Sequence, residues 1–140
     1  HLDSLVPLEK RLFPVLEPAR RKALKVATLA TGLADKTVSL FYEKRLHERV
    51  SQAWIDRCRM QIGAVLDVLE ADRASRSSTW WFGDAIGHAD IAVAAVLRFT
   101  SEVHADLVTL SDYPALAAHS AQAEALKMFE DVSQPFIAPT

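Results

Sequence analysis

The sequence contains few of the residues that cross-link or punctuate small proteins. It has one cysteine and only 4 glycines among 140 residues. A single cysteine excludes an intramolecular disulfide and favours a reducing compartment, so we expect the protein to be cytoplasmic. No apolar run is long enough to span a bilayer, and no membrane partner is expected.

The sequence also lacks a strong charge of either sign. Its net charge is −2, from 16 basic and 18 acidic residues, so nucleic acid is not an expected partner. The basic residues Arg20, Arg21, Lys22 and Lys25 form one cluster, for which a solvated helix face is favoured over an anion-binding patch. Metal-ligand spacings, glycine-rich phosphate loops and nucleophile–base pairs are all missing. We therefore expect neither a metal site nor a catalytic residue in this chain.

Hydrophobic residues make up 50% of the sequence, which is typical of a helical domain. The most apolar stretch follows Trp80 and Trp81 and continues from His88 to about Glu102, with Asp90 as its one acidic residue before the end. Such a run indicates the buried central helix of an all-α protein. We predict a bundle of about five helices around it.

The start of this helix is marked by capping residues. With Gly87 as the N-cap, Asp90 stands at the third helical position, where its carboxylate can accept a hydrogen bond from the N-cap backbone. Ile86 and Ile91 then occupy the two positions of a hydrophobic staple. A general-base role for Asp90 is the alternative, but the capping role is favoured. His88 is predicted to be a partly exposed polar residue and not a ligand.

The remaining helices are predicted from hydrophobic periodicity and capping residues. One runs from Ala19 to about His47, with an apolar face wide enough to pack on two sides. A second follows the cap Ser51 and gives way to a polar turn over 71–79. Asp112 is the expected cap of a helix whose first turn contains Pro114, and a short last helix covers 125–132. Cys58 lies on the apolar face of the second helix, so we interpret it as structural.

The segment Ile86–Ala92, with Arg98 and Phe99 after it, resembles the capping box and central helix of the C-terminal domain of glutathione S-transferases. Gly87 stands where that family usually has Ser or Thr, a substitution that weakens the cap only slightly. Weaker similarities to bacterial members occur in 11–14, 41–45 and 113–116. Leu126 stands where many members have proline.

The resemblance implies that residues 1–16 are an interdomain linker with the end of a preceding helix, and that 17–140 form the helical C-terminal domain. An N-terminal thioredoxin-like domain, expected to be missing from this chain, would bind most of the glutathione and activate its thiol. The intact protein would be a homodimer, paired through its first long helices, that conjugates glutathione to small hydrophobic electrophiles in detoxification. This chain alone would be inactive. The alternative is a non-catalytic interaction or scaffold module.

The resemblance also identifies three candidate substrate-binding residues, all in the first long helix. Asp35 stands where many members have an acidic residue that reaches the glutathione amino group across the dimer interface. Phe41 and Tyr42 could line the electrophile pocket. For Asp35 the alternative is a solvated residue beside Lys36, and for the two aromatic residues it is a place in the core.

Overall fold

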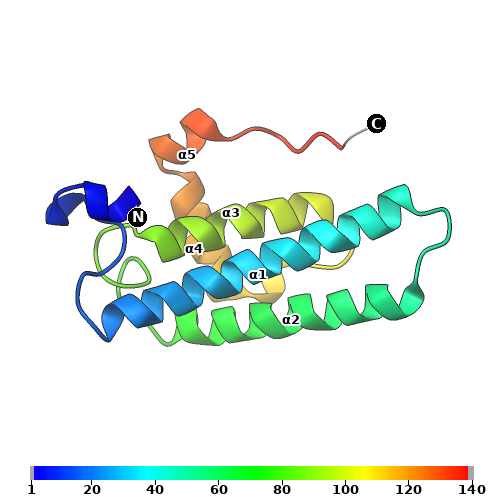
Figure 1. Cartoon of the computed structure of the whole chain (residues 1–140), viewed down its shortest axis with the longest axis horizontal. Coiled ribbons are helices and arrows are strands. Elements are labelled where there is room, and N and C mark those ends of the chain that lie inside the picture. The colour runs from blue at the N-terminus through cyan, green and yellow to red at the C-terminus, as the bar shows by residue number, and fades with distance from the viewer. Residues whose placement is uncertain (1, 139–140) are drawn as a thin grey trace.

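The computed structural model describes residues 2–138, and within this range it contains five α-helices and no strand longer than one bridge. The helices are α1 (Ala19–Leu46), α2 (Gln52–Ala74), α3 (His88–Val103), α4 (Pro114–Glu124) and α5 (Lys127–Val132). Figure 1 shows α1, α2 and α3 as long rods that run side by side. The predicted all-α fold, with about five helices, is confirmed.

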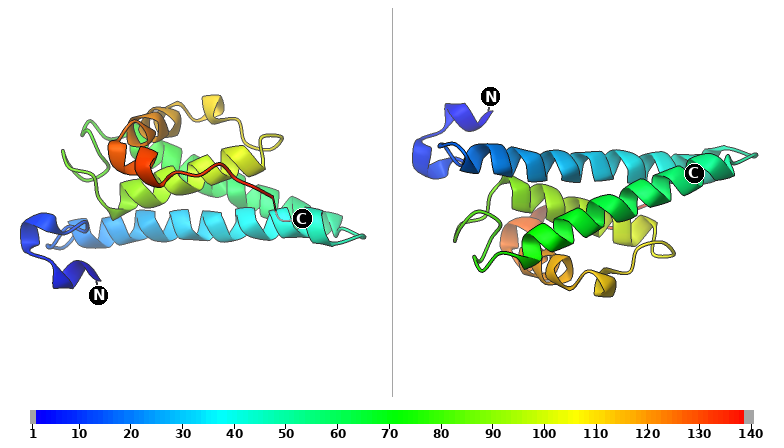
Figure 2. Two further views of the ribbon diagram at one scale, coloured as in Figure 1. Left: turned by 90° about the horizontal axis from the view of Figure 1, so that it is seen from above. Right: turned by 90° about the horizontal axis from the view of Figure 1, so that it is seen from below.

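Helix α3 is the centre of the bundle, as predicted. It contacts α1 on one side and α4 on the other, while α2 packs against both α1 and α4 (Figure 2). Val93, Ala94 and Leu97 of α3 are fully buried. Burying a valine or leucine side chain contributes roughly 1.5–3 kcal/mol, so Val93 and Leu97 each make a substantial contribution to the stability of the bundle.

Helix α1 buries one face and leaves another open. Residues at helical spacing are buried against the core: Ala23, Val26, Ala30, Leu33, Thr37, Leu40 and Glu43. Leu24, Val38 and Leu46 of the same helix remain exposed. The wide apolar face expected from the sequence is therefore covered on one side only within the described residues.

Two helix boundaries differ from the sequence-based predictions. Helix α2 ends at Ala74, about one turn later than predicted. The polar turn predicted over 71–79 therefore begins only after Ala74. Asp112 does not cap α4: it belongs to a 3-10 turn, Leu110–Asp112, and Tyr113 precedes the helix without a side-chain cap. The carboxylate of Glu70 in α2 accepts the N–H groups of Ala115 and Leu116 instead, each at 2.9 Å.

The segment before α1 contains two 3-10 turns, Leu2–Leu5 and Leu8–Lys10, within the range expected to be an interdomain linker. Asp3 organises it by accepting the N–H groups of Leu12 and Phe13 at 2.7 and 3.2 Å. The parts of the predicted linker and helical domain that fall on His1 and on residues 139–140 lie outside the described residues. No helix described here has the length and apolar character needed to cross a membrane.

Candidate functional site

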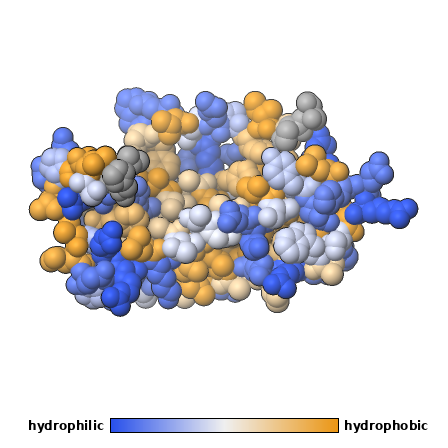
Figure 3. Space-filling view, in the orientation of Figure 1, coloured by the Kyte–Doolittle hydropathy of each residue, from blue (hydrophilic) through white to orange (hydrophobic). Residues whose placement is uncertain are grey.

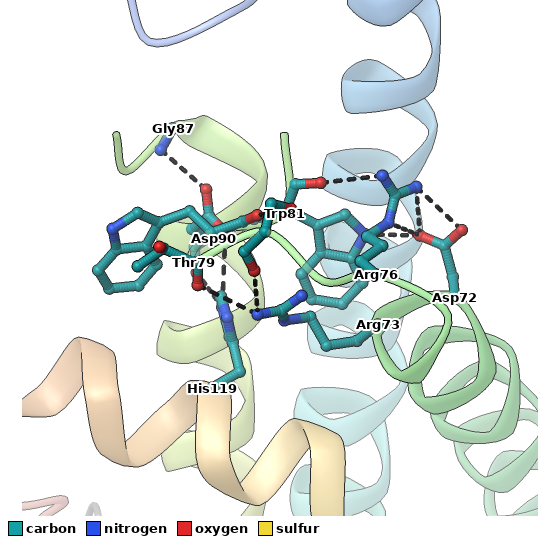
Figure 4. A network of polar contacts seen from close by, with 10 residues as sticks. Asp72, Arg73, Arg76, Thr79, Trp81, Gly87, Asp90 and His119 are labelled. Carbon is teal, nitrogen blue, oxygen red and sulfur yellow. Dashed lines mark hydrogen bonds and ion pairs between the residues drawn. The ribbon is translucent and has the colours of Figure 1, made fainter. Parts of the chain in front are cut away.

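The entry to α3 is built around the carboxylate of Asp90, which is 1% exposed. Its Oδ2 accepts the N–H of Gly87 at 2.8 Å, in the N-cap geometry, and its Oδ1 accepts the N–H of Trp81 at 2.8 Å (Figure 4). Because Gly87 has no side chain, it cannot accept the reciprocal hydrogen bond from the N–H of Asp90 that completes a capping box. Ile86 and Ile91 both pack against the cluster of Trp80, Ala94, Ala123 and Phe129.

The loop before α3 is held by a second carboxylate. Asp72 of α2 accepts the indole Nε1–H of Trp81 at 2.5 Å and two hydrogen bonds from Nη2 of Arg76, at 2.9 and 3.0 Å. Arg76 also donates to the carbonyl of Trp81 at 2.9 Å, and Arg73 donates to the carbonyl of Thr79 at 3.1 Å. Figure 4 shows these groups converging on Trp81 from α2 and from the loop.

His119 of α4 completes this network from the opposite side. It is buried between the rings of Trp80 and Trp81, and burial lowers the pKa of its imidazole. Its Nε2 is 3.3 Å from the backbone carbonyl of Asp90 and 3.9 Å from the carboxylate Oδ1. Both carboxylate oxygens therefore hold backbone N–H groups in a closed, tightly packed region. This arrangement suits a structural anchor and not a general base.

The three residues singled out on α1 lie in two places. Phe41 and Tyr42 are in ring contact, with centroids 5.3 Å apart. Asp35 is exposed and lies two helical turns before Tyr42. The structure thus places the two aromatic residues together, and Asp35 lies earlier on the same helix, apart from them.

Two further aromatic residues join Phe41 and Tyr42. The ring of Phe136, in the segment after α5, lies edge-on to Phe41 at 5.3 Å and to Phe99 of α3 at 5.6 Å. We call Phe41, Tyr42, Phe99 and Phe136 the aromatic cluster. Sequence reasoning missed Phe136, because no local pattern shows that the C-terminal segment folds back over α3 and α1.

Two apolar hollows meet beside this cluster. The first, which we call the C-terminal groove, has a volume of about 370 Å³ and lies between α3, α5 and residues 133–136. The second is a trough of similar volume between α1 and α3, and both are lined by Ala95 and Phe99. Figure 3 shows apolar residues reaching the surface along the middle of this face, among hydrophilic residues near its edges. An apolar surface of this kind suits a hydrophobic ligand or a packed neighbour.

The other reactive groups are protected. Cys58 is fully buried, and burial raises the pKa of its thiol, so it is a poor nucleophile. The pKa of His104 is lowered, first by burial, and its Nε2 lies 3.0 Å from the carbonyl of Thr37. Within residues 2–138, no group of three or more His, Cys, Asp or Glu side chains could hold a metal ion.

The comparisons with known proteins agree with this geometry. The family model described as glutathione S-transferase, C-terminal domain, matches residues 52–122, which is half of the chain. The chain belongs to this family. The match spans α2, α3 and most of α4, so the central helix of this transferase domain and its Asp90 anchor lie inside the matched region.

Solved transferase structures extend the similarity over nearly the whole domain. A glutathione S-transferase from Methylobacterium radiotolerans, in complex with glutathione sulfonate, has 26% identity and a TM-score of 0.81 over 94% of this chain and 63% of its own. A glutathione transferase family member from Pseudomonas fluorescens, with bound S-(propanoic acid)-glutathione, has 30% identity and a TM-score of 0.78 over 96% of this chain and 66% of its own. Maleylpyruvate isomerase from Pseudomonas aeruginosa, at 23% identity and a TM-score of 0.74, shares the fold.

The transferase domain described here is shorter than these relatives. It spans 63% of the length of the first two transferases it matches. No curated protein sequence matches the chain.

Proposed function

We propose that this chain is the electrophile-binding side of a glutathione transferase whose thiol-activating site lies in a preceding thioredoxin-like domain. The observation that carries the proposal is the aromatic cluster, which joins α1, α3 and the C-terminal segment beside an open apolar trough. Relatives at 26–30% identity bind glutathione or its derivatives, which supports glutathione as the co-substrate.

The proposed division of labour follows from the chemistry of the two substrates. A thiolate needs nearby hydrogen-bond donors or positive charge to lower its pKa. An apolar electrophile needs a shaped hydrophobic surface and few polar groups. The cluster offers the second kind of surface, since Phe41 and Phe136 are half-buried while Tyr42 is 44% exposed. Tyr42 would thus contact the electrophile directly, and Phe41 would form the floor beneath it.

Asp35 is proposed to bind the glutathione amino group of a second subunit. It is exposed on α1, so its carboxylate is free to face a partner molecule across a homodimer formed through α1 and α2. A carboxylate and an ammonium form a charge-assisted hydrogen bond. We propose that the dimer is cytoplasmic and acts in detoxification.

The test compares this 140-residue chain with a longer protein that carries the preceding domain. We expect the longer protein to conjugate glutathione to an activated aryl chloride and the chain alone to be inactive. Tyr42→Ala should raise KM for the aryl chloride about threefold to tenfold, consistent with loss of one apolar contact, and should leave KM for glutathione unchanged. Asp35→Asn should raise KM for glutathione and leave KM for the aryl chloride unchanged.

The control is Ser111→Ala, an exposed residue outside the aromatic cluster and both hollows, which should change neither constant. A folded longer protein that binds no glutathione and conjugates none would overturn the proposal and favour a non-catalytic scaffold. Conjugation by the 140-residue chain alone would contradict the proposed division of labour.

A further inference from the structure

The backbone of Gly87 does not require a glycine. Its φ of −127° and ψ of 179° are extended values that any residue adopts. Serine, aspartate and asparagine are favoured at an N-cap, because their side chains accept an N–H group of the first helical turn. A glycine at this position therefore lacks a local stabilising contact, and the packing around it supplies a reason for its presence.

The backbone of Leu12 occupies the space where a side chain of residue 87 would begin. A Cβ atom at Gly87 would lie 2.7 Å from the carbonyl oxygen of Leu12, closer than such atoms approach in proteins. At Gly32 and Gly63, by contrast, a Cβ atom would meet nothing within 4 Å among the described residues. Gly87 is thus a position where two backbone segments approach each other closely, which is a characteristic use of glycine.

The close approach serves a set of contacts between the segment before α1 and the start of α3. The carbonyl of Leu12 accepts the N–H of His88 at 3.0 Å, one of the N–H groups that have no partner inside the helix. The rings of Phe13 and His88 are in contact, with centroids 4.6 Å apart. Asp3 accepts the N–H groups of Leu12 and Phe13. Figure 1 shows this segment, in dark blue, beside the start of α3. We call these contacts of Asp3, Leu12, Phe13 and His88 the linker latch.

We propose that Gly87 is a positioning residue: the space above it lets the linker latch form on α3, and the latch fixes the orientation of the preceding domain. The second part rests on the proposed function, because it requires that domain. A thiolate held there must meet an electrophile on the aromatic cluster of this chain, and a misplacement of about 1 Å can lower a rate about 100-fold.

The latch is tested on the 140-residue chain by amide hydrogen exchange, followed by NMR. In Gly87→Ala the added methyl group should displace the Leu12 carbonyl. The amides of Leu12, Phe13 and His88 should then exchange about tenfold faster, as expected for the loss of about one hydrogen bond. Gly32→Ala is the matched control, since a Cβ atom there has open space, and it should leave these three amides unchanged.

Gly87→Ser separates the latch from ordinary capping. If only capping mattered, the serine hydroxyl would accept the N–H of Asp90 and protect the start of α3. If the latch matters, the Cβ atom of serine should displace Leu12 as alanine does, and the amides of Leu12 and His88 should exchange faster. Slower or unchanged exchange of these two amides in Gly87→Ser would overturn the latch.

Asp3→Ala approaches the latch from its other end. Asp3 is not hydrogen-bonded to His88, but its loss should release Leu12 and so speed the exchange of the His88 amide. Combined with Gly87→Ala it should add little to this effect, because both changes break the same contacts. Independent, additive effects on the His88 amide would contradict a single latch.

The positioning role is tested on the longer protein that carries the preceding domain. Gly87→Ala should increase its radius of gyration in small-angle X-ray scattering, at a folded fraction confirmed by circular dichroism. It should also lower kcat for the aryl chloride about tenfold or more and leave KM for glutathione unchanged. Gly32→Ala should change none of these quantities.

The two readouts distinguish failure of this inference from failure of the proposed function. An unchanged radius of gyration in Gly87→Ala, together with faster exchange of the latch amides, would overturn the positioning role. A longer protein that conjugates no glutathione would overturn the proposed function, and the exchange and scattering measurements would still decide on the latch and on the domain orientation.

Discussion

Replacement of Asp90 by alanine removes the acceptor of two backbone hydrogen bonds at once. Both bonds are 2.8 Å long, and they tie the turn at Trp81 and the N-cap Gly87 to the first turn of α3. Since α3 is the centre of the bundle, the loss should destabilise the whole domain and not only one helix end.

The magnitude follows from the surroundings of the two donors. The bond from the Trp81 N–H is buried, so its loss would leave a donor without water, at about 2–3 kcal/mol. The N–H of Gly87 is only partly buried, and water can replace much of its bond, so its loss should cost about 1 kcal/mol. We therefore expect Asp90→Ala to lower the free energy of unfolding by about 3–4 kcal/mol.

The assay is urea unfolding followed by circular dichroism at pH 7. The free energy of unfolding of Asp90→Asn should lie between those of the unchanged protein and Asp90→Ala. The amide oxygen can accept one of the two N–H groups, while the NH₂ faces the other. Asp84→Ala is the control, since Asp84 is exposed in the same loop and should change stability by less than about 0.5 kcal/mol. If Asp90→Ala lost less than about 1 kcal/mol, comparable to an ordinary exposed cap, the two-donor reasoning would be refuted.

Three other predictions concern groups outside α3. Glu70→Ala should destabilise the protein by about 1–2 kcal/mol, because α4 loses the acceptor of its first N–H groups; urea unfolding checks this, with exposed Asp67→Ala as the control. The thiol of Cys58, whose pKa is raised by burial, should react with a maleimide only as fast as the chain unfolds, and labelling of the native protein within minutes would contradict its burial. Burial lowers the pKa of His104 and His119, so the unfolded chain takes up these protons first and stability should fall from about pH 7 towards pH 5; a flat urea midpoint over this range would count against it.

The elements that could be predicted from the sequence are those specified by neighbouring residues. The capping position of Asp90 is three residues from Gly87, and the apolar run that makes α3 the core is continuous in sequence. Asp90 also accepts the N–H of Trp81, nine residues earlier. That bond depends on how the loop folds back, and no helical signal encodes it.

The features that the sequence could not reveal depend on contacts between distant segments. Asp112 has the right residue type and spacing for a cap, but Glu70, 45 residues before Ala115, provides the acceptor. Phe136 reaches the aromatic cluster because the C-terminal segment crosses α3 and α1, an arrangement set by tertiary packing. The ion pair between Arg98 and Glu124 arises in the same way, because its two side chains are on different helices.

Three carboxylates of this domain, those of Asp90, Glu70 and Glu43, share one role. Asp90 holds the loop before α3, Glu70 holds the start of α4, and Glu43 accepts the N–H of Ser51 at 2.7 Å before α2. In each case an acidic side chain on one element fixes the backbone entry to a helix, where the helix dipole favours negative charge. Glu124 differs from them, because it bonds to the side chain of Arg98 and not to a backbone N–H.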